Sequence, residues 1–192
     1  MVHSKTLKAA ALLGAVFATG GWTAVEAATI RFEPTPKTVS AGDSFSLDLL
    51  GQGFADILDG GGVNISFNPG IVHVTGVIID TSVWDFFTSV GSIDNNLGSV
   101  SDIIFNALQN VTGNFPIATI QFQAVGVGTT ALTLSESAAN PFASGGNPLA
   151  VTFANGSVSV PEPVSVPEPA TWLLLLAGFG LAARFDTKGR KS

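Results

Sequence analysis

Alternation of apolar and polar residues with a period of two is the feature that most constrains the fold of this chain. Phe45, Leu47 and Leu49 would share one face of a strand, and the segment 117–125 alternates in the same way over its second half. Clusters of glycine, proline, asparagine and aspartate separate such segments, and none has the period of an amphipathic helix of normal length. The pattern predicts an all-β fold, an antiparallel sandwich of about nine strands.

Turn residues and apolar runs divide the body into segments. We expect turns at Ser40–Asp43, Asp59–Gly62, Asn68–Gly70 and Gly126–Gly128. We expect an edge strand at Ile30–Phe32, separate strands at 71–79, 103–108 and 117–125, and a closing hairpin that pairs Val151–Phe153 with Gly156–Val160.

The amino-terminal segment is typical of a signal peptide. Lys5 and Lys8 provide its positive charge, and Leu7–Ala18 is an apolar run of suitable length. A small-x-small pattern ends at Ala27, which predicts a signal peptide over residues 1–27 and cleavage between Ala27 and Ala28. The alternative, an N-terminal membrane anchor, requires a longer apolar run.

The carboxyl-terminal segment has three parts in a fixed order. A motif of Pro167, Glu168 and Pro169 precedes an apolar run at 170–183, and basic residues follow. The basic residues are Arg184, Lys188, Arg190 and Lys191. Because the prolines prevent a helix from continuing into the run, we predict a linker at 161–169, one membrane-spanning helix at 170–183 and a cytoplasmic tail at 184–192.

This tail resembles the PEP-CTERM sorting signal of exopolysaccharide-producing bacteria. The resemblance implies that an exosortase-type membrane enzyme recognises Pro167-Glu168-Pro169 and processes the chain nearby. It also implies a secreted protein of the cell envelope or extracellular matrix, held only transiently by its C-terminal helix. A near copy of the motif at Val160–Pro163 does not adjoin the apolar run. The alternative is an ordinary tail anchor behind a proline-rich linker.

Charge and cysteine content exclude several classes of function. No lysine or arginine lies between Lys37 and Arg184, and the chain has no cysteine. An acidic body repels phosphate, so we expect no nucleic-acid partner. Without cysteine there is neither a disulfide framework nor a thiolate zinc site, and the fold must depend on its hydrophobic core.

The body at 28–160 resembles a cohesin-type domain of the carbohydrate-binding-module superfamily. The matching segments are Val39–Phe45, Gly62–Val77 and Ile117–Ala124. The resemblance implies a nine-stranded jelly-roll sandwich that binds partners and performs no chemistry. Cohesins bind dockerin modules, which makes a cell-surface docking function one expectation for this chain.

We predict no catalytic residue and no bound metal. His73 is the only histidine outside the leader, so no Ser-His-Asp or Cys-His set can form, and we expect it to lie half-exposed on a strand. Pairs of loop aspartates, Asp56 with Asp59 and Asp80 with Asp85, resemble turn caps more than the two carboxylates of a glycosidase. Calcium binding by such aspartates stays open as an alternative.

Trp84, Asp85 and Phe86 are the best candidates for binding carbohydrate. Trp84 is the only tryptophan between the leader and the tail, and aromatic faces stack on sugar rings while a carboxylate accepts bonds from hydroxyls. The favoured alternative is that Trp84 and one phenylalanine cap the core of the sandwich.

The leading hypothesis is an exported, non-enzymatic protein that binds exopolysaccharide or matrix. The alternatives are a protein-docking module, whose partner is a cell-surface protein, and a polysaccharide-active enzyme.

Overall fold

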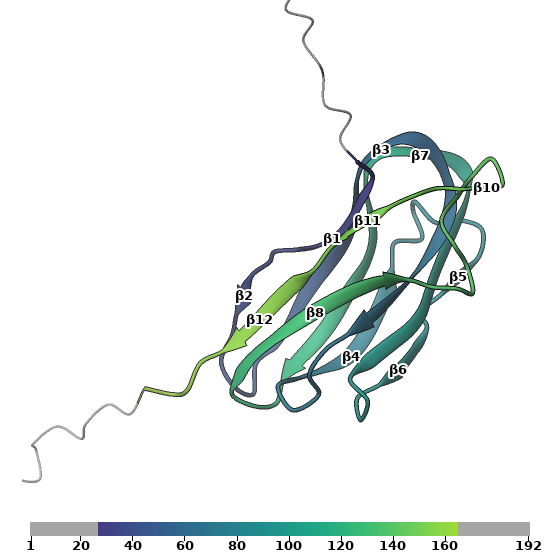
Figure 1. Ribbon diagram of the computed structural model, residues 1–192. Coiled ribbons are helices and arrows are strands. Elements are labelled where there is room, and N and C mark those ends of the chain that lie inside the picture. The colour runs from purple at the N-terminus through teal and green to yellow at the C-terminus, as the bar shows by residue number, and fades with distance from the viewer. Residues whose placement is uncertain (1–26, 165–192) are drawn as a thin grey trace, which may run out of the picture.

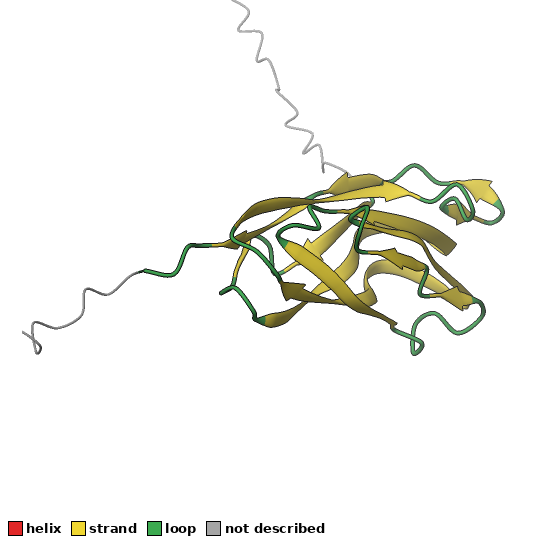
Figure 2. Cartoon of the chain, turned by 90° about the horizontal axis from the view of Figure 1, so that it is seen from below, coloured by secondary structure: helices red, strands yellow, loops and turns green. Residues whose placement is uncertain are grey.

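The computed structural model describes residues 27–164, and this part of the chain contains strands and loops without a helix (Figure 2). No helix in this range is therefore long enough to cross a membrane. The strands are β1 (Thr29–Glu33), β2 (Lys37–Thr38), β3 (Ser44–Ser66), β4 (Val72–Ile79), β5 (Thr88–Ser89), β6 (Ser92–Asp94), β7 (Ser99–Ala124), β8 (Gly128–Glu136), β9 (Ala143–Ser144), β10 (Asn147–Pro148), β11 (Thr152–Ala154) and β12 (Gly156–Val160).

Several predictions fall outside the described residues. They are the signal peptide up to residue 26, the motif Pro167-Glu168-Pro169, the apolar run 170–183 and the basic residues Arg184, Lys188, Arg190 and Lys191.

Two long strands, β3 and β7, organise the sandwich. They pair antiparallel along most of their length, and register shifts between Leu49 and Gly60 let the ribbon bend from one layer into the other (Figure 1). The first layer has the order β11-β1-β3-β7-β4 and the second the order β2-β12-β8-β3-β7, with β5 and β6 at its edge. The all-β jelly-roll prediction is confirmed. The predicted strands 103–108 and 117–125 are two parts of the single strand β7, each in a different layer.

The predicted turn at Asp59–Gly62 is wrong, because these residues lie inside β3. The glycines serve close packing there. A Cβ on Gly61 would lie 2.6 Å from the ring of Phe142, and one on Gly60 would lie 2.1 Å from Oδ1 of Asn106. The run of small residues therefore lets neighbouring side chains pack closely against the strand. Composition alone cannot distinguish such a glycine-rich strand from a turn.

The predicted closing hairpin is also wrong. β11 pairs parallel with β1, whereas β12 pairs with β8 and β2, so the two strands belong to different layers. The side chain of Asn155 between them accepts a hydrogen bond from the N–H of Leu134 at 3.0 Å. β1 is likewise no edge strand, because it lies between β3 and β11.

The core between the layers follows the period-two pattern. β8 alternates strictly, with Thr130, Leu132 and Leu134 buried and their neighbours exposed or half-buried. A row of aromatic rings runs through the core near the bend of β3 and β7. Successive ring centroids lie 4.9, 5.4, 4.6, 5.8 and 6.1 Å apart along Phe54, Phe115, Trp84, Phe105, Phe142 and Phe153.

Candidate functional site

Trp84 fixes the loop that follows β4. Its side chain is 1% exposed, and its Nε1–H donates to the carbonyl of Pro116 at 2.9 Å. The N–H groups of Val83 and Trp84 both donate to the carbonyl of Asp80, which forms the turn that leads the ring inward. Because the ring packs against Phe105 and Phe115, it presents no face to a sugar. The structure therefore places Trp84 where the core-capping interpretation expects it.

Asp85 holds the next part of the loop onto β7. One carboxylate oxygen accepts the N–H of Leu108 at 2.9 Å, and the other accepts the side-chain amide of Gln109 at 3.0 Å. These two bonds, the backbone one first, lower the pKa of Asp85 below its usual value of 3.8, because they stabilise the ionised form. Both oxygens are engaged, so the side chain acts as a clamp between the loop and the strand.

Apolar side chains gather at the surface above this clamp. Phe86 is 67% exposed, Phe87 56% and Leu108 73%. The N–H of Phe86 donates to the carbonyl of Asn106, and the amide of Asn106 donates to the carbonyl of Phe87, so these segments lie side by side. We call Phe86, Phe87, Val90 and Leu108 the apolar patch; Val90 is 50% exposed just after β5.

The outer face of the second layer carries mostly small, uncharged residues, and Asp102 and Glu136 are the exposed acidic residues next to Asn64. Ser66 lies opposite Thr133 on one side and Ser99 on the other, and Asn64 lies opposite Ser135. The outward positions farther along are Ala131, Ser157, Thr129 and Ser159. Such side chains lose little conformational entropy when they are covered, so the face and the patch together suit contact with another macromolecule.

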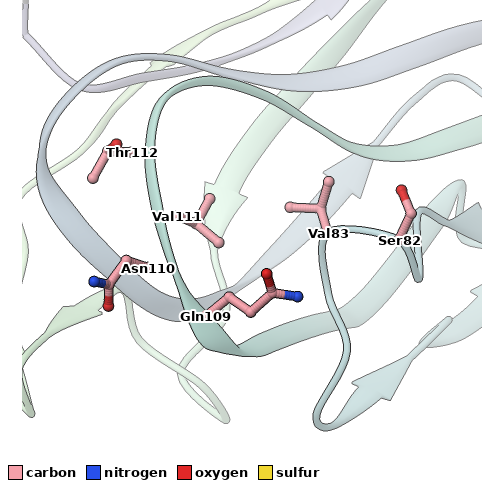
Figure 3. Close-up of a pocket in the computed structure, with 6 residues that line it drawn as sticks. All are labelled: Ser82, Val83, Gln109, Asn110, Val111 and Thr112. Carbon is pink, nitrogen blue, oxygen red and sulfur yellow. The ribbon is translucent and has the colours of Figure 1, made fainter.

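A shallow pocket of about 270 Å³ lies on the other side of the Asp85 clamp. Ser82 and Val83 come from the loop after β4, and Gln109, Asn110, Val111 and Thr112 come from the bend of β7 (Figure 3). No ionisable side chain lines it, so its hydroxyl and amide groups could form hydrogen bonds but could not act as an acid or a base.

The remaining predicted residues serve turns and strands. His73 is half-buried on β4 between the buried residues Val72 and Val74, as predicted. Asp80 accepts the N–H of Ser82 at 3.0 Å, and Asp59 accepts the N–H of Gly146 at 2.9 Å. Among residues 27–164, no three histidine, cysteine or acidic residues lie close enough together to hold a metal ion.

Comparison with known proteins finds a sorting motif at the carboxyl terminus and a fold likeness for the body. Residues 165–191 match the model of the PEP-CTERM protein-sorting motif. This motif implies an exported protein that associates with the cell envelope and is processed by an exosortase-type partner. No curated protein sequence matches the chain.

Solved structures similar to the body include several cohesins. A cohesin of Clostridium thermocellum, solved as the Coh-OlpA-Doc918 type I cohesin–dockerin complex, has a TM-score of 0.59 at 10% identity, over 70% of this chain and 99% of that one. The third cohesin ScaC, in complex with the ScaB dockerin from Acetivibrio cellulolyticus, has a TM-score of 0.57 at 18% identity, over 70% and 99%. The non-cellulosomal cohesin from Archaeoglobus fulgidus has a TM-score of 0.55 at 14% identity, over 71% and 92%.

The chain therefore combines a PEP-CTERM sorting motif at its carboxyl terminus with a β-sandwich body that has the fold of cohesins. The sequence-based choice of Asp85 and Phe86 lies within the region of the apolar patch, but it did not include Phe87, Val90 or Leu108. The sequence indicates only part of this patch. Phe87 follows Phe86 directly and could have been included, whereas Leu108 looks like any other strand residue until its neighbours in space are known.

Proposed function

We propose that this exported protein is a non-catalytic docking module that holds another surface protein at the cell envelope. An exosortase-type enzyme sorts it there. The observation that carries the proposal is the apolar patch at the edge of a layer of mostly small side chains, on a sandwich with the cohesin fold.

The contacts of the patch support docking more than loop mobility. Asp85, Asn106 and Trp84 tie the loop to β7 and to the core, so Phe86 and Phe87 are held in place while exposed. A pre-ordered apolar surface loses little entropy on binding, and exposed aromatic residues are common anchors of protein interfaces. The two cohesins solved with dockerins show that this fold is compatible with protein docking.

A non-enzymatic function fits the chemistry of the described side chains. His73 lies on a strand apart from the clamp, and the carboxylates of Asp59, Asp80 and Asp85 cap loops. A polysaccharide-active enzyme would require two carboxylates that face each other across a cleft.

Site-specific cross-linking on intact cells tests the docking proposal. A photo-reactive residue at position 87 or 108 should give a discrete adduct with one protein, and the same residue at position 57, exposed on β3, should not. Leu108→Asp should remove the adduct from position 87. Equal adducts from all three positions, or none from positions 87 and 108, would contradict docking through this patch.

A further inference from the structure

A groove crosses the outer face of the first layer, on the opposite side of the sandwich from the outer face of the second. It consists of one depression of about 530 Å³ and a second of about 260 Å³. Both are lined by Leu50 and Pro116, so they form one elongated groove. It extends from Arg31 on β1 to the loop that follows β4.

A register shift in the central strands creates this groove. Leu49 lies opposite Ala118 but Leu50 lies opposite Pro116, so Ile117 is the extra residue, and its side chain is fully buried. Beside it, the ring of Phe115 covers Gly51 so closely that a Cβ there would lie 2.2 Å from the ring. Gly51 therefore faces the core, and the inward turn of Ile117 leaves Leu50 and Pro116 as cross-strand neighbours at the centre of the groove.

The groove combines an apolar floor with polar walls. Leu50, Pro116 and Ile78 supply apolar surface, and Ile78 is 55% exposed. On one wall the carboxylate of Asp48 accepts the hydroxyl of Thr119 at 2.8 Å, which orients the carboxylate. Further along, Asp80, Ser82, Gln52 and Asn114 provide carboxylate, hydroxyl and amide groups.

The backbone under the centre of the groove offers no free strand edge. β3 lies between β1 and β7 over this stretch, and β7 lies between β3 and β4. An extended peptide binds a sheet by pairing with a free edge strand, and of the groove residues only Ile78 and Ile79 belong to one, β4. An occupant that spans the centre at Leu50 and Pro116 must therefore bind through side chains, with an apolar face for the floor and hydroxyl groups for the walls.

We propose that this groove binds a neutral polysaccharide chain. A pyranose ring has an apolar face and equatorial hydroxyls, which matches the floor and the walls. The elongated shape suits more than one ring. Charge selects against acidic polysaccharides, because Asp48 and Asp80 are both negative and the guanidinium of Arg31 is paired with Glu33.

The groove and the apolar patch are separate surfaces. Asp48, Ile78 and Thr119 lie on the first layer, whereas Phe87 and Leu108 lie at the edge of the second. One molecule can therefore hold a partner protein and a glycan at the same time. Glycan binding at the groove does not depend on docking at the patch.

Affinity electrophoresis tests the proposal. The full exported chain is run in native gels that contain a neutral glucan, mannan, galactan or xylan, or the acidic polysaccharides alginate and hyaluronan. We expect at least one neutral polymer to retard the chain and both acidic polymers to leave it unretarded. Asp48→Ala should weaken the apparent affinity about tenfold and Ile78→Thr about threefold.

Matched variants make the test specific. Asp56→Ala and Ile57→Thr introduce the same chemical changes on exposed positions of β3 outside the groove, and both should bind like the unmodified chain. Leu108→Asp should also leave glycan binding unchanged, even if docking is lost. The proposal is overturned if no neutral polymer retards the chain, if only an acidic polymer does, or if Asp48→Ala and Ile78→Thr bind as well as their controls.

Discussion

Trp84 stabilises the protein through packing and through one hydrogen bond, and two substitutions separate these contributions. Trp84→Ala should lower the free energy of unfolding by about 3–5 kcal/mol, because it leaves a cavity between Phe105 and Phe115. Trp84→Phe retains most of the packing but leaves the carbonyl of Pro116 without its donor, at a cost of about 1–3 kcal/mol. Urea unfolding followed by circular dichroism measures both free energies. Equal losses of stability in the two variants would mean that the hydrogen bond accounts for the whole effect and that packing at this site is unimportant.

The Asp85 clamp should make stability depend on acid. Hydrogen bonds from Leu108 and Gln109 lower the pKa of Asp85 in the folded chain below 3.8. Its contribution is therefore fully present above the unfolded pKa and is lost as the pH falls through the lower, folded pKa. Asp85→Asn should be less stable than the unmodified chain at pH 7, and the difference should shrink below about pH 4.

The comparison for this prediction is Asp56→Asn, at an exposed position of β3. Thermal unfolding between about pH 2 and pH 7 should show a stability difference from the unmodified chain that narrows at low pH for Asp85→Asn but not for Asp56→Asn. If the stability difference between Asp85→Asn and the unmodified chain stays constant with pH, the ionised carboxylate does not hold the loop to Leu108.

At the scale of single strands, the glycine run in β3 tests close packing directly. Gly61→Ala places a methyl group against the ring of Phe142 and should destabilise the fold by about 1–3 kcal/mol. A smaller residue at position 142 relieves the contact, so Gly61→Ala should cost less in a Phe142→Leu background than alone. Gly70→Ala, in the turn before β4, is the control, since its nearest contact would be 3.3 Å away.

The strand pattern in the sequence was sufficient for the fold class but not for connectivity. Alternation in segments such as 45–49 and 117–125 depends on which face is buried, and burial follows directly from residue type. Whether the chain turns at Gly60–Gly62 or continues as a strand depends on packing against Phe142 and Asn106, which are far away in the sequence. For the same reason, the pairing of β11 with β1 could not be read from the Asn155-Gly156 step, which is typical of a hairpin.

The candidate site was predictable only where a residue type is rare. Trp84 and the residues after it stand out as a cluster of large side chains, and this led to the loop that carries Phe86 and Phe87 of the apolar patch. Leu108 and the groove residues Asp48 and Ile78 have ordinary strand contexts. Their positions in the patch and in the groove depend on cross-strand neighbours and on the register shift near Leu50, which no local pattern specifies.

β4 is an edge strand of the first layer, and Asn95 protects it. The side-chain amide of Asn95 accepts the N–H of Val74 at 2.8 Å and donates to the carbonyl of the same residue at 2.9 Å. Asn95→Ala exposes both backbone groups, so it should promote edge-to-edge association as well as lower stability by about 1–2 kcal/mol. Light scattering should detect the association, and Asn96→Ala, next to it on the same exposed loop, should stay monodisperse.

At the scale of the whole molecule, the chain leaves the sandwich at the end opposite the bend of β3 and β7 (Figure 1). Val160 ends β12 opposite Gly128, near the turn at Val125–Val127, whereas Leu108 lies near the bend. Residues 161–169 span at most about 30 Å. An uncleaved precursor held by its C-terminal run should therefore keep the turn close to the membrane and the apolar patch directed outward.

Cysteine labelling tests this orientation, because the chain has no cysteine of its own. Leu108→Cys and Val127→Cys each introduce one thiol at an exposed position. A bulky PEG-maleimide should label position 108 at the same rate in membrane-held precursor and in detached chain, but position 127 more slowly in the precursor. The ratio of the two rates at each position removes differences in intrinsic exposure. Slowing at position 108 instead would place the patch against the membrane and contradict a docking surface that faces outward.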